Sequence, residues 1–255
     1  MKDIIVFEQP VNEHIRACLR LEHLFQQAIY HLRGASQWDS RSTLTAIIDI
    51  INLFDRPDLK NKLTKELSRH LANLSRLEHV PHVDNQKLAA VLLELEDLID
   101  ALHATNGKLC QELRENEFIN TIRQYQLNPG GTCGFDTPAY LLWLQQPAAN
   151  RIAHLAHWLR MLETCLAVVN MLMKLTRQSS VPVTKVAQNG FYQAALDPQA
   201  PCQLIRVAVA SELNVYPEIS VGRHGICIRF YALNINERAS QIQQDVPFKL
   251  TTCIF

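Results

Sequence analysis

The sequence predicts an α+β protein, with an N-terminal all-helical bundle followed by a C-terminal antiparallel, sandwich-like β domain. Up to about residue 178, apolar residues recur at steps of three and four, the spacing of one helix face. After Pro182 the period changes to two, as in strands with one buried face, and short turns favour antiparallel pairing. This change predicts domain ranges of 1–178 and 179–255.

Capping and stop signals bound the expected helices. Asn12 is placed to cap the first helix and Asp84 a later one, because their side chains can accept from free backbone N–H groups. Asp55-Arg56-Pro57 ends the second helix, since proline disfavours helical geometry in the residue before it. The expected helices cover 12–33, 40–54, 58–78, 85–103, 108–126 (one helix or two short ones), 138–146 and 148–177.

A leucine stripe marks the third expected helix. Its members are Leu59, Leu63, Leu67, Leu71, Leu74 and Leu77. Such a stripe can be the seam of a coiled coil with a partner chain. We favour packing within the chain, because flanking helices of similar length are available to cover it.

Alternation and one turn signal define the expected strands. Asn189-Gly190 suits a type I′ turn, which predicts a hairpin between Val183–Ala187 and Phe191–Gln193. Residues 226–231 should bury Ile226, Ile228 and Phe230 on one face and place Arg229 on the other. Other strands are expected over 204–210 and 248–254, and residues 2–8 can form a strand that joins this late sheet.

The composition narrows the classes of function. Hydrophobic residues make up 47% of the 255 residues, as in a folded globular protein. Lys+Arg and Asp+Glu are both 25, and this zero formal charge argues against a protein that coats nucleic acid. The apolar region from Leu155 to Leu175 carries too many polar residues to span a bilayer. No signal peptide is expected, because Lys2-Asp3 precedes only a short apolar run.

Metal and cofactor signatures are weak. The seven cysteines are scattered without a CxxC pair, which favours reduced thiols in the cytosol. The sequence contains neither a phosphate loop nor GxGxxG. The pairs His79/His82 and His154/His157 lack the further ligands of a zinc site, so we expect no metal and no cofactor.

The segment from Asn128 to Pro138 is the most enzyme-like part of the chain. Cys133 among glycines can be a nucleophile on a tight turn, but the segment holds no base. We favour a structural loop, in which Asp136 or Thr137 caps the next helix and Phe135 pins the loop to the core. A cysteine-dependent enzyme using Cys133 stays open as an alternative, as does a ligand-binding β domain regulated by the helices.

Arginines at element ends and exposed faces remain as candidates for recognition. Arg16 and Arg20 lie one helical turn apart and can grip carboxylates, although each can equally be an ordinary solvated charge. The full set is Arg16, Arg20, Arg56, Arg206, Arg223 and Arg229.

Four motifs run through the chain from end to end. They are Phe7-Glu8-x-Pro10-x-Asn12-Glu13-x-x-Arg16-x-x-Leu19-Arg20-x-Glu22, Asn128-Pro129-Gly130-Gly131-x-Cys133-x-Phe135-Asp136-x-Pro138, Asn189-Gly190-Phe191-Tyr192-Gln193 and Tyr216-Pro217-x-Ile219-Ser220. With these motifs the chain resembles the ZapD family of cell-division proteins. The resemblance implies a cytoplasmic, non-enzymatic homodimer that binds the acidic C-terminal tail of FtsZ, the tubulin-like division GTPase. It also implies bundling of FtsZ filaments and recruitment to midcell, with neither nucleic acid nor membrane as a partner.

The resemblance also implies a basic tail-binding surface. Arg20, Arg56 and Arg229 match basic positions of the family, and we add Arg16 and Arg223 from helix spacing and strand proximity. Glu117 and Leu141 stand where we expect basic residues or histidine in relatives, which predicts a shifted or narrower surface. We further expect the strand over Ile4 to Phe7 to anchor the first helix on the β domain, so that Arg229 shares the site.

Overall fold

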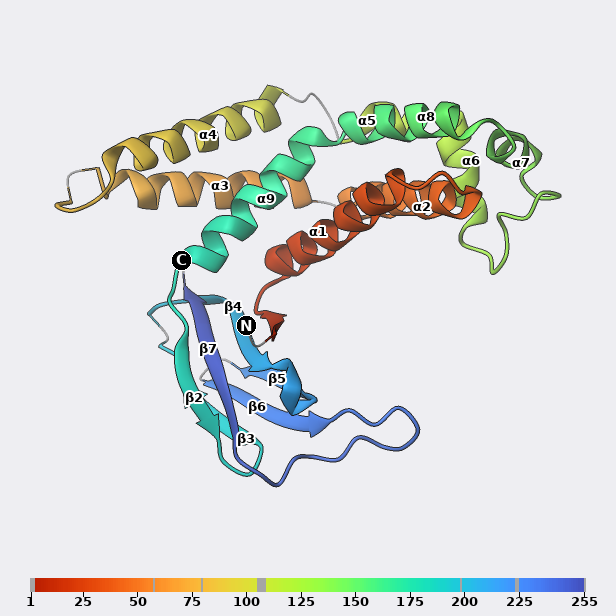
Figure 1. Cartoon of the computed structure of the whole chain (residues 1–255). Helices are drawn as coiled ribbons and strands as arrows, with labels where there is room; N and C mark the ends of the chain where they lie inside the picture. The colour runs from red at the N-terminus through yellow and green to blue at the C-terminus, as the bar shows by residue number, and fades with distance from the viewer. Residues whose placement is uncertain are drawn as a thin grey trace. The chain divides into compact units, whose positions relative to one another are not determined.

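The computed structural model describes residues 3–56, 58–78, 80–104, 109–197, 199–222 and 225–254 (Figure 1). The chain divides into two compact units, Met1–Arg16 together with Met173–Phe255, and Ala17–Leu172. The fold class is as predicted, because helices come first and antiparallel strands follow. The domain ranges 1–178 and 179–255 stay a prediction.

The helices of the described residues follow the predicted order with shifted ends. They are α1 (Glu13–Leu32), α2 (Gln37–Phe54), α3 (Leu59–Ser75), α4 (Asn85–Ala104), α5 (Gln111–Glu115), α6 (Glu117–Tyr125), α7 (Pro138–Leu144), α8 (Ala148–Arg160) and α9 (Glu163–Gln178). The segment 108–126, predicted as one helix or two short ones, forms the two short helices α5 and α6. The predicted helix 148–177 is also two, α8 and α9, bent by 59°. No single helix of the described residues is long and apolar enough to cross a membrane, and only this bent pair reaches that length and hydropathy.

Side-chain caps explain several helix starts. Asn12 Oδ1 accepts from Ile15 N at 3.0 Å and Asp84 Oδ1 accepts from Lys87 N at 3.1 Å, which confirms both predicted caps. Helix α2 begins three residues earlier than predicted, because Ser36 starts a capping box with Asp39.

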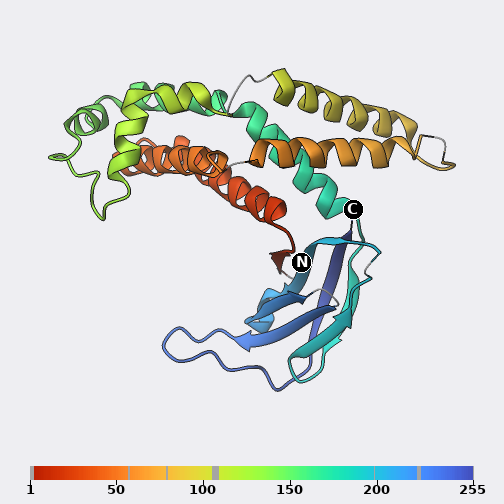
Figure 2. The same cartoon turned by 180° about the vertical axis from the view of Figure 1, so that it is seen from behind.

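Helices α3 and α4 lie side by side in both views (Figures 1 and 2). The first half of the leucine stripe is buried at Leu59, Leu63 and Leu67, and α4 faces it with its own row of buried leucines. Packing within the chain is therefore confirmed for this half. Leu77 lies beyond the end of α3 and is exposed, so the stripe does not continue as a buried seam.

The strands form two antiparallel sheets, ordered β1-β4-β7-β2 and β3-β6-β5. Their bounds are β1 (Ile4–Pro10), β2 (Val183–Ala187), β3 (Phe191–Ala195), β4 (Cys202–Ala210), β5 (Val215–Gly222), β6 (Gly225–Ala232) and β7 (Val246–Ile254), with a short 3₁₀ helix, η1 (Ser211–Leu213), between β4 and β5. Strand β1 pairs with β4, so the start of the chain belongs to the late sheet.

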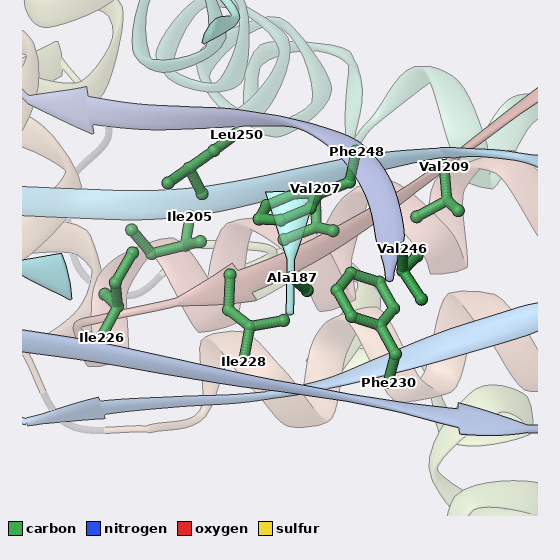
Figure 3. Packing of buried hydrophobic residues seen from close by; sticks show 10 residues of the cluster. All are labelled: Ala187, Ile205, Val207, Val209, Ile226, Ile228, Phe230, Val246, Phe248 and Leu250. Atoms are coloured by element: carbon green, nitrogen blue, oxygen red, sulfur yellow. The ribbon is translucent and has the colours of Figure 1, made fainter. Parts of the chain in front are cut away.

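The core of the β unit lies between the two sheets. Figure 3 shows Ile228 and Phe230 of β6 pointing toward Ile205 and Val207 of β4. Ile226, Ile228 and Phe230 are almost fully buried while Arg229 is exposed, as the alternation predicted.

The predicted hairpin around Asn189-Gly190 is wrong in its pairing. Both residues have positive φ, at 49° and 70°, and Phe191 N donates to Gln188 O at 2.9 Å, so the turn itself forms. Strand β2, however, pairs with β7 and β3 with β6, which leaves only the bridge Gln188↔Phe191 between the predicted partners. Each strand finds its partner within its own sheet, and the turn carries the chain from one sheet to the other.

Strand β5 was not predicted as a strand. Its Pro217 lacks a backbone N–H, and proline in a run of residues argues against a central strand. The structure accommodates it because β5 is an edge strand, in which Pro217 stands opposite Phe230.

Candidate partner-binding surface

The two arginines of α1 differ in their ion pairing. Arg16 Nη1 donates to Glu13 Oε2 at 2.9 Å, so its charge is partly matched by an acid one turn earlier. Arg20 is exposed, and the described residues offer its guanidinium no hydrogen bond or ion pair. Of the two, Arg20 is therefore more available to bind a carboxylate of another molecule.

The other predicted arginines lie on separate elements. Arg56 is exposed directly after Asp55, the C-cap residue of α2. Arg229 is exposed on β6, with its Cζ 5.5 Å from the centre of the Phe191 ring and Glu218 opposite on β5. Arg223 lies outside the described residues. Because Arg20 and Arg229 belong to different compact units, their sharing of one site stays a prediction.

Arg206, the remaining arginine of the set, has a structural partner. Its Nε donates to Glu8 Oε1 at 2.8 Å, and Arg177 Nε and Nη2 donate to the same carboxylate at 2.9 and 2.8 Å. Burial alone would raise the pKa of Glu8, but the two guanidiniums outweigh it and hold that pKa below its ordinary value. This cluster joins β1, β4 and the end of α9.

A second arginine cluster was missed from the sequence. Asp55 binds Arg114 Nη1 through one carboxylate oxygen and Arg123 Nη2 through the other. The two arginines lie in the last turns of the short helices α5 and α6, and nothing in their spacing points to Asp55. Burial and the neighbouring Arg123 lower the pKa of Arg114.

The loop from Asn128 to Pro138 differs from its prediction in two respects, at Phe135 and at the predicted helix cap. Phe135 is 85% exposed, so the prediction that it pins the loop to the core is wrong. Pro138 opens α7 as predicted. Thr137 occupies the N-cap position, but its hydroxyl donates to Cys133 O at 3.1 Å and makes no side-chain cap.

Arg41 of α2 holds this loop. Its guanidinium donates to Thr132 O at 3.4 Å and lies 4.9 Å from the centre of the Tyr140 ring. Leu141, one of the two expected departures from the family pattern, packs against the loop, since a Cβ at Gly134 would lie 2.7 Å from Leu141 Cδ2. The loop is thus part of the helical unit's structure at Thr132 and Gly134, while Cys133 remains exposed.

The pair His154/His157 does not build a metal centre with other described residues. Across those residues no group of three or more His, Cys, Asp or Glu side chains could hold an ion. His154 Nδ1 accepts from Trp143 Nε1 at 3.1 Å, which gives that histidine a structural contact. His79 lies outside the described residues, so the His79/His82 pair is not tested.

The fold and these side chains define a two-part α+β protein whose candidate recognition groups are arginines. The ZapD family model, described as "Cell division protein", matches residues 19–229. Cell division protein ZapD of Coxiella burnetii is 44% identical over 251 residues, which cover 98% of this chain and 97% of that protein. The ZapD proteins of Methylococcus capsulatus and Janthinobacterium sp. are 36% and 34% identical over 100% and 99% of this chain and the whole of each relative. The chain therefore belongs to the ZapD family, and its role lies in cell division.

Proposed function

We propose that the protein binds the acidic C-terminal tail of FtsZ and, as a homodimer, crosslinks FtsZ filaments during assembly of the Z-ring at midcell. The observation that carries the proposal is the state of Arg20. It is an exposed guanidinium without an ion pair among the described residues, and it lies within the stretch that the family model matches. A planar guanidinium in this state can bind a carboxylate through two hydrogen bonds.

The other arginines support the proposal to different degrees. Arg56 and Arg229 are exposed and add positive charge to the helical and the β unit. Arg16 contributes less, because Glu13 already partly matches its charge. Arg223 belongs to the proposed set on the sequence alone.

Dimerisation follows from what crosslinking requires. A protein with one tail site can decorate a filament, whereas two sites on one particle can join two filaments, and a two-fold dimer provides them. A hydrogen bond to a charged group contributes about 1.5–3 kcal/mol, and less when exposed. One tail should therefore bind in roughly the micromolar range, and many tails along a filament raise the effective affinity by about 10²–10⁴.

A pull-down with purified proteins tests the proposal. We expect the full-length protein to retain intact FtsZ and not to retain FtsZ that lacks its tail. Arg20→Glu should weaken retention, while Arg33→Glu, the same charge reversal at another exposed arginine, should leave it unchanged. Equal retention of FtsZ with and without its tail would overturn the proposal.

A hollow in the β unit favours a second candidate, a β domain that binds an apolar ligand. Its volume is about 310 Å³, and Ile4, Ala208, Leu213 and Pro247 contribute to its lining. Binding of a fluorescent apolar probe such as anilinonaphthalene sulfonate that Ala208→Arg abolishes would support this function. Probe binding that Ala208→Arg leaves unchanged would exclude this hollow.

The cysteine-dependent alternative is tested by Cys133→Ala. Loss of cell-division function by this variant, with FtsZ binding intact, would favour chemistry at the exposed thiol.

A further inference from the structure

Two arginines share a single carboxylate where α2 ends. Asp55 caps the C-terminus of α2, and its two carboxylate oxygens bind Arg114 and Arg123 separately. All three residues belong to the unit Ala17–Leu172, so the cluster lies within one compact body. Asp55 itself shows that the paired guanidiniums fit the size and shape of a carboxylate.

The charges of the cluster do not balance. The two guanidiniums of Arg114 and Arg123 face the single carboxylate of Asp55. The C-terminus of α2 supplies about half a negative charge, which leaves an excess of positive charge. Burial, and after it the repulsion by the neighbouring Arg123, lowers the pKa of Arg114.

The two arginines have different access to solvent. The side chain of Arg114 is 10% exposed, its Nε donates to Leu109 O at 2.9 Å, and its buried Nη2 has no hydrogen-bond partner among the described residues. The side chain of Arg123 is 29% exposed. Arg114 thus approaches Asp55 from the buried side, and Arg123, which shares the same carboxylate, is the more exposed of the two arginines.

We infer that Arg123, backed by Arg114, holds a carboxylate of an acidic peptide next to Asp55. Asp55 then competes with the peptide for the same N–H groups and sets how tightly an external acid binds. This inference rests on the proposed function and names two further residues for it. It also gives a place where acidic side chains can bind although Glu117 stands where a basic residue was expected.

The first test is a cycle of two peptides and two proteins. A fluorescein-labelled FtsZ tail peptide, and the same peptide with every Asp and Glu changed to Asn and Gln, are titrated with full-length protein by fluorescence anisotropy. Arg123→Gln should weaken the acidic peptide about fivefold and leave the amide peptide unchanged, because the lost contact is with a carboxylate. Arg160→Gln, at an exposed arginine of α8, should change neither.

The second test separates binding from stability. Asp55→Asn removes the internal competitor, and we expect it to tighten the acidic peptide about threefold while it lowers the melting temperature. If the cluster only stabilises the fold, Asp55→Asn should lower the melting temperature without raising the affinity for the acidic peptide. If Arg123→Gln and Asp55→Asn leave the affinity for the acidic peptide unchanged while Arg20→Glu weakens it, this inference is overturned and the proposed function stands. Failure of the wild-type protein to bind the acidic peptide would overturn both.

Discussion

Glu8 and Arg177 are joined by two hydrogen bonds, from Nε to Oε1 at 2.9 Å and from Nη2 to Oε2 at 2.8 Å, although 169 residues separate them in the chain. Arg206, which stands opposite Glu8 in the β1–β4 register, donates a third at 2.8 Å. One carboxylate therefore fixes the first strand of the chain to the end of α9 and to the sheet.

Glu8→Gln should destabilise the β unit. The substitution leaves two partly buried guanidiniums facing a neutral amide, and we expect a loss of about 1–2 kcal/mol in the free energy of unfolding. Urea unfolding followed by circular dichroism measures it. Glu237→Gln, at an exposed loop position, serves as the matched control and should change the free energy little. An equal effect of both variants would show that Glu8 contributes no more than a surface acid.

The same cluster makes stability depend on pH. The pKa of Glu8 is depressed in the folded protein, because the two arginines outweigh the effect of burial. Its contribution is therefore present above the unfolded-state pKa, which is about 4.3 for a glutamate, and is lost as the pH falls through the lower folded-state pKa. Urea midpoints measured from neutral to acid pH should show the wild type and Glu8→Gln converging on acidification. A difference that stays constant would contradict the assignment.

Much of the fold could be predicted because local signals decided it. Asn12 and Asp84 cap the helices that they were expected to cap, and the alternation in β6 gave the buried face of Ile228 and the exposed face of Arg229. The hairpin failed because a turn signal fixes the turn and not the partners of its strands. Asn189-Gly190 adopts the expected conformation, and the choice between one sheet and two is made by distant strands.

The site was less accessible to sequence reasoning. Periodicity places Arg20 on an exposed face of α1. It cannot show that Arg16 forms an ion pair with Glu13 or that Arg206 forms one with Glu8. The Asp55 cluster joins Asp55 to residues 59 and 68 positions away in the chain, and only the tertiary fold brings them together. Ion pairs between distant elements leave no pattern in a single sequence.

Gly190→Ala should lower the stability of the fold, whereas Gly222→Ala should change it little. Gly190 has a φ of +70°, which disfavours any residue with a Cβ. A Cβ there would also lie 2.3 Å from Ile242 O and would clash with it. At Gly222 the nearest atom that the described residues would bring to a Cβ, Gly225 O, is 3.8 Å away. Thermal unfolding should show a loss of about 1–3 kcal/mol for the first variant and little change for the second. Similar losses would mean that the strain at Gly190 relaxes.

Arg151→Lys should destabilise the helical unit. The Arg151 guanidinium is buried, and it donates from three nitrogens to Ser40 Oγ at 3.0 Å, to Leu144 O at 3.0 Å and to Ala35 O at 2.7 Å. A lysine ammonium cannot reproduce these directions, so we expect a loss of about 2–3 kcal/mol in the free energy of unfolding. Arg160→Lys on the exposed side of α8 is the control, and urea unfolding of both variants is the measurement. A loss below that of the control would contradict a structural role for this guanidinium.

Bundling of FtsZ filaments should fall as salt rises. The proposed contacts are made by exposed arginines, and charges at the surface are screened over about 10 Å at 0.1 M ionic strength and about 3 Å at 1 M. Because crosslinking needs several weak tail contacts at once, a modest loss at each site multiplies over the filament. Co-sedimentation of FtsZ filaments with the wild-type protein should therefore decline steeply with salt, and Arg20→Glu should shift the decline to lower salt. Co-sedimentation that is equal at low and high salt would mean that apolar contacts, rather than these arginines, hold the filaments.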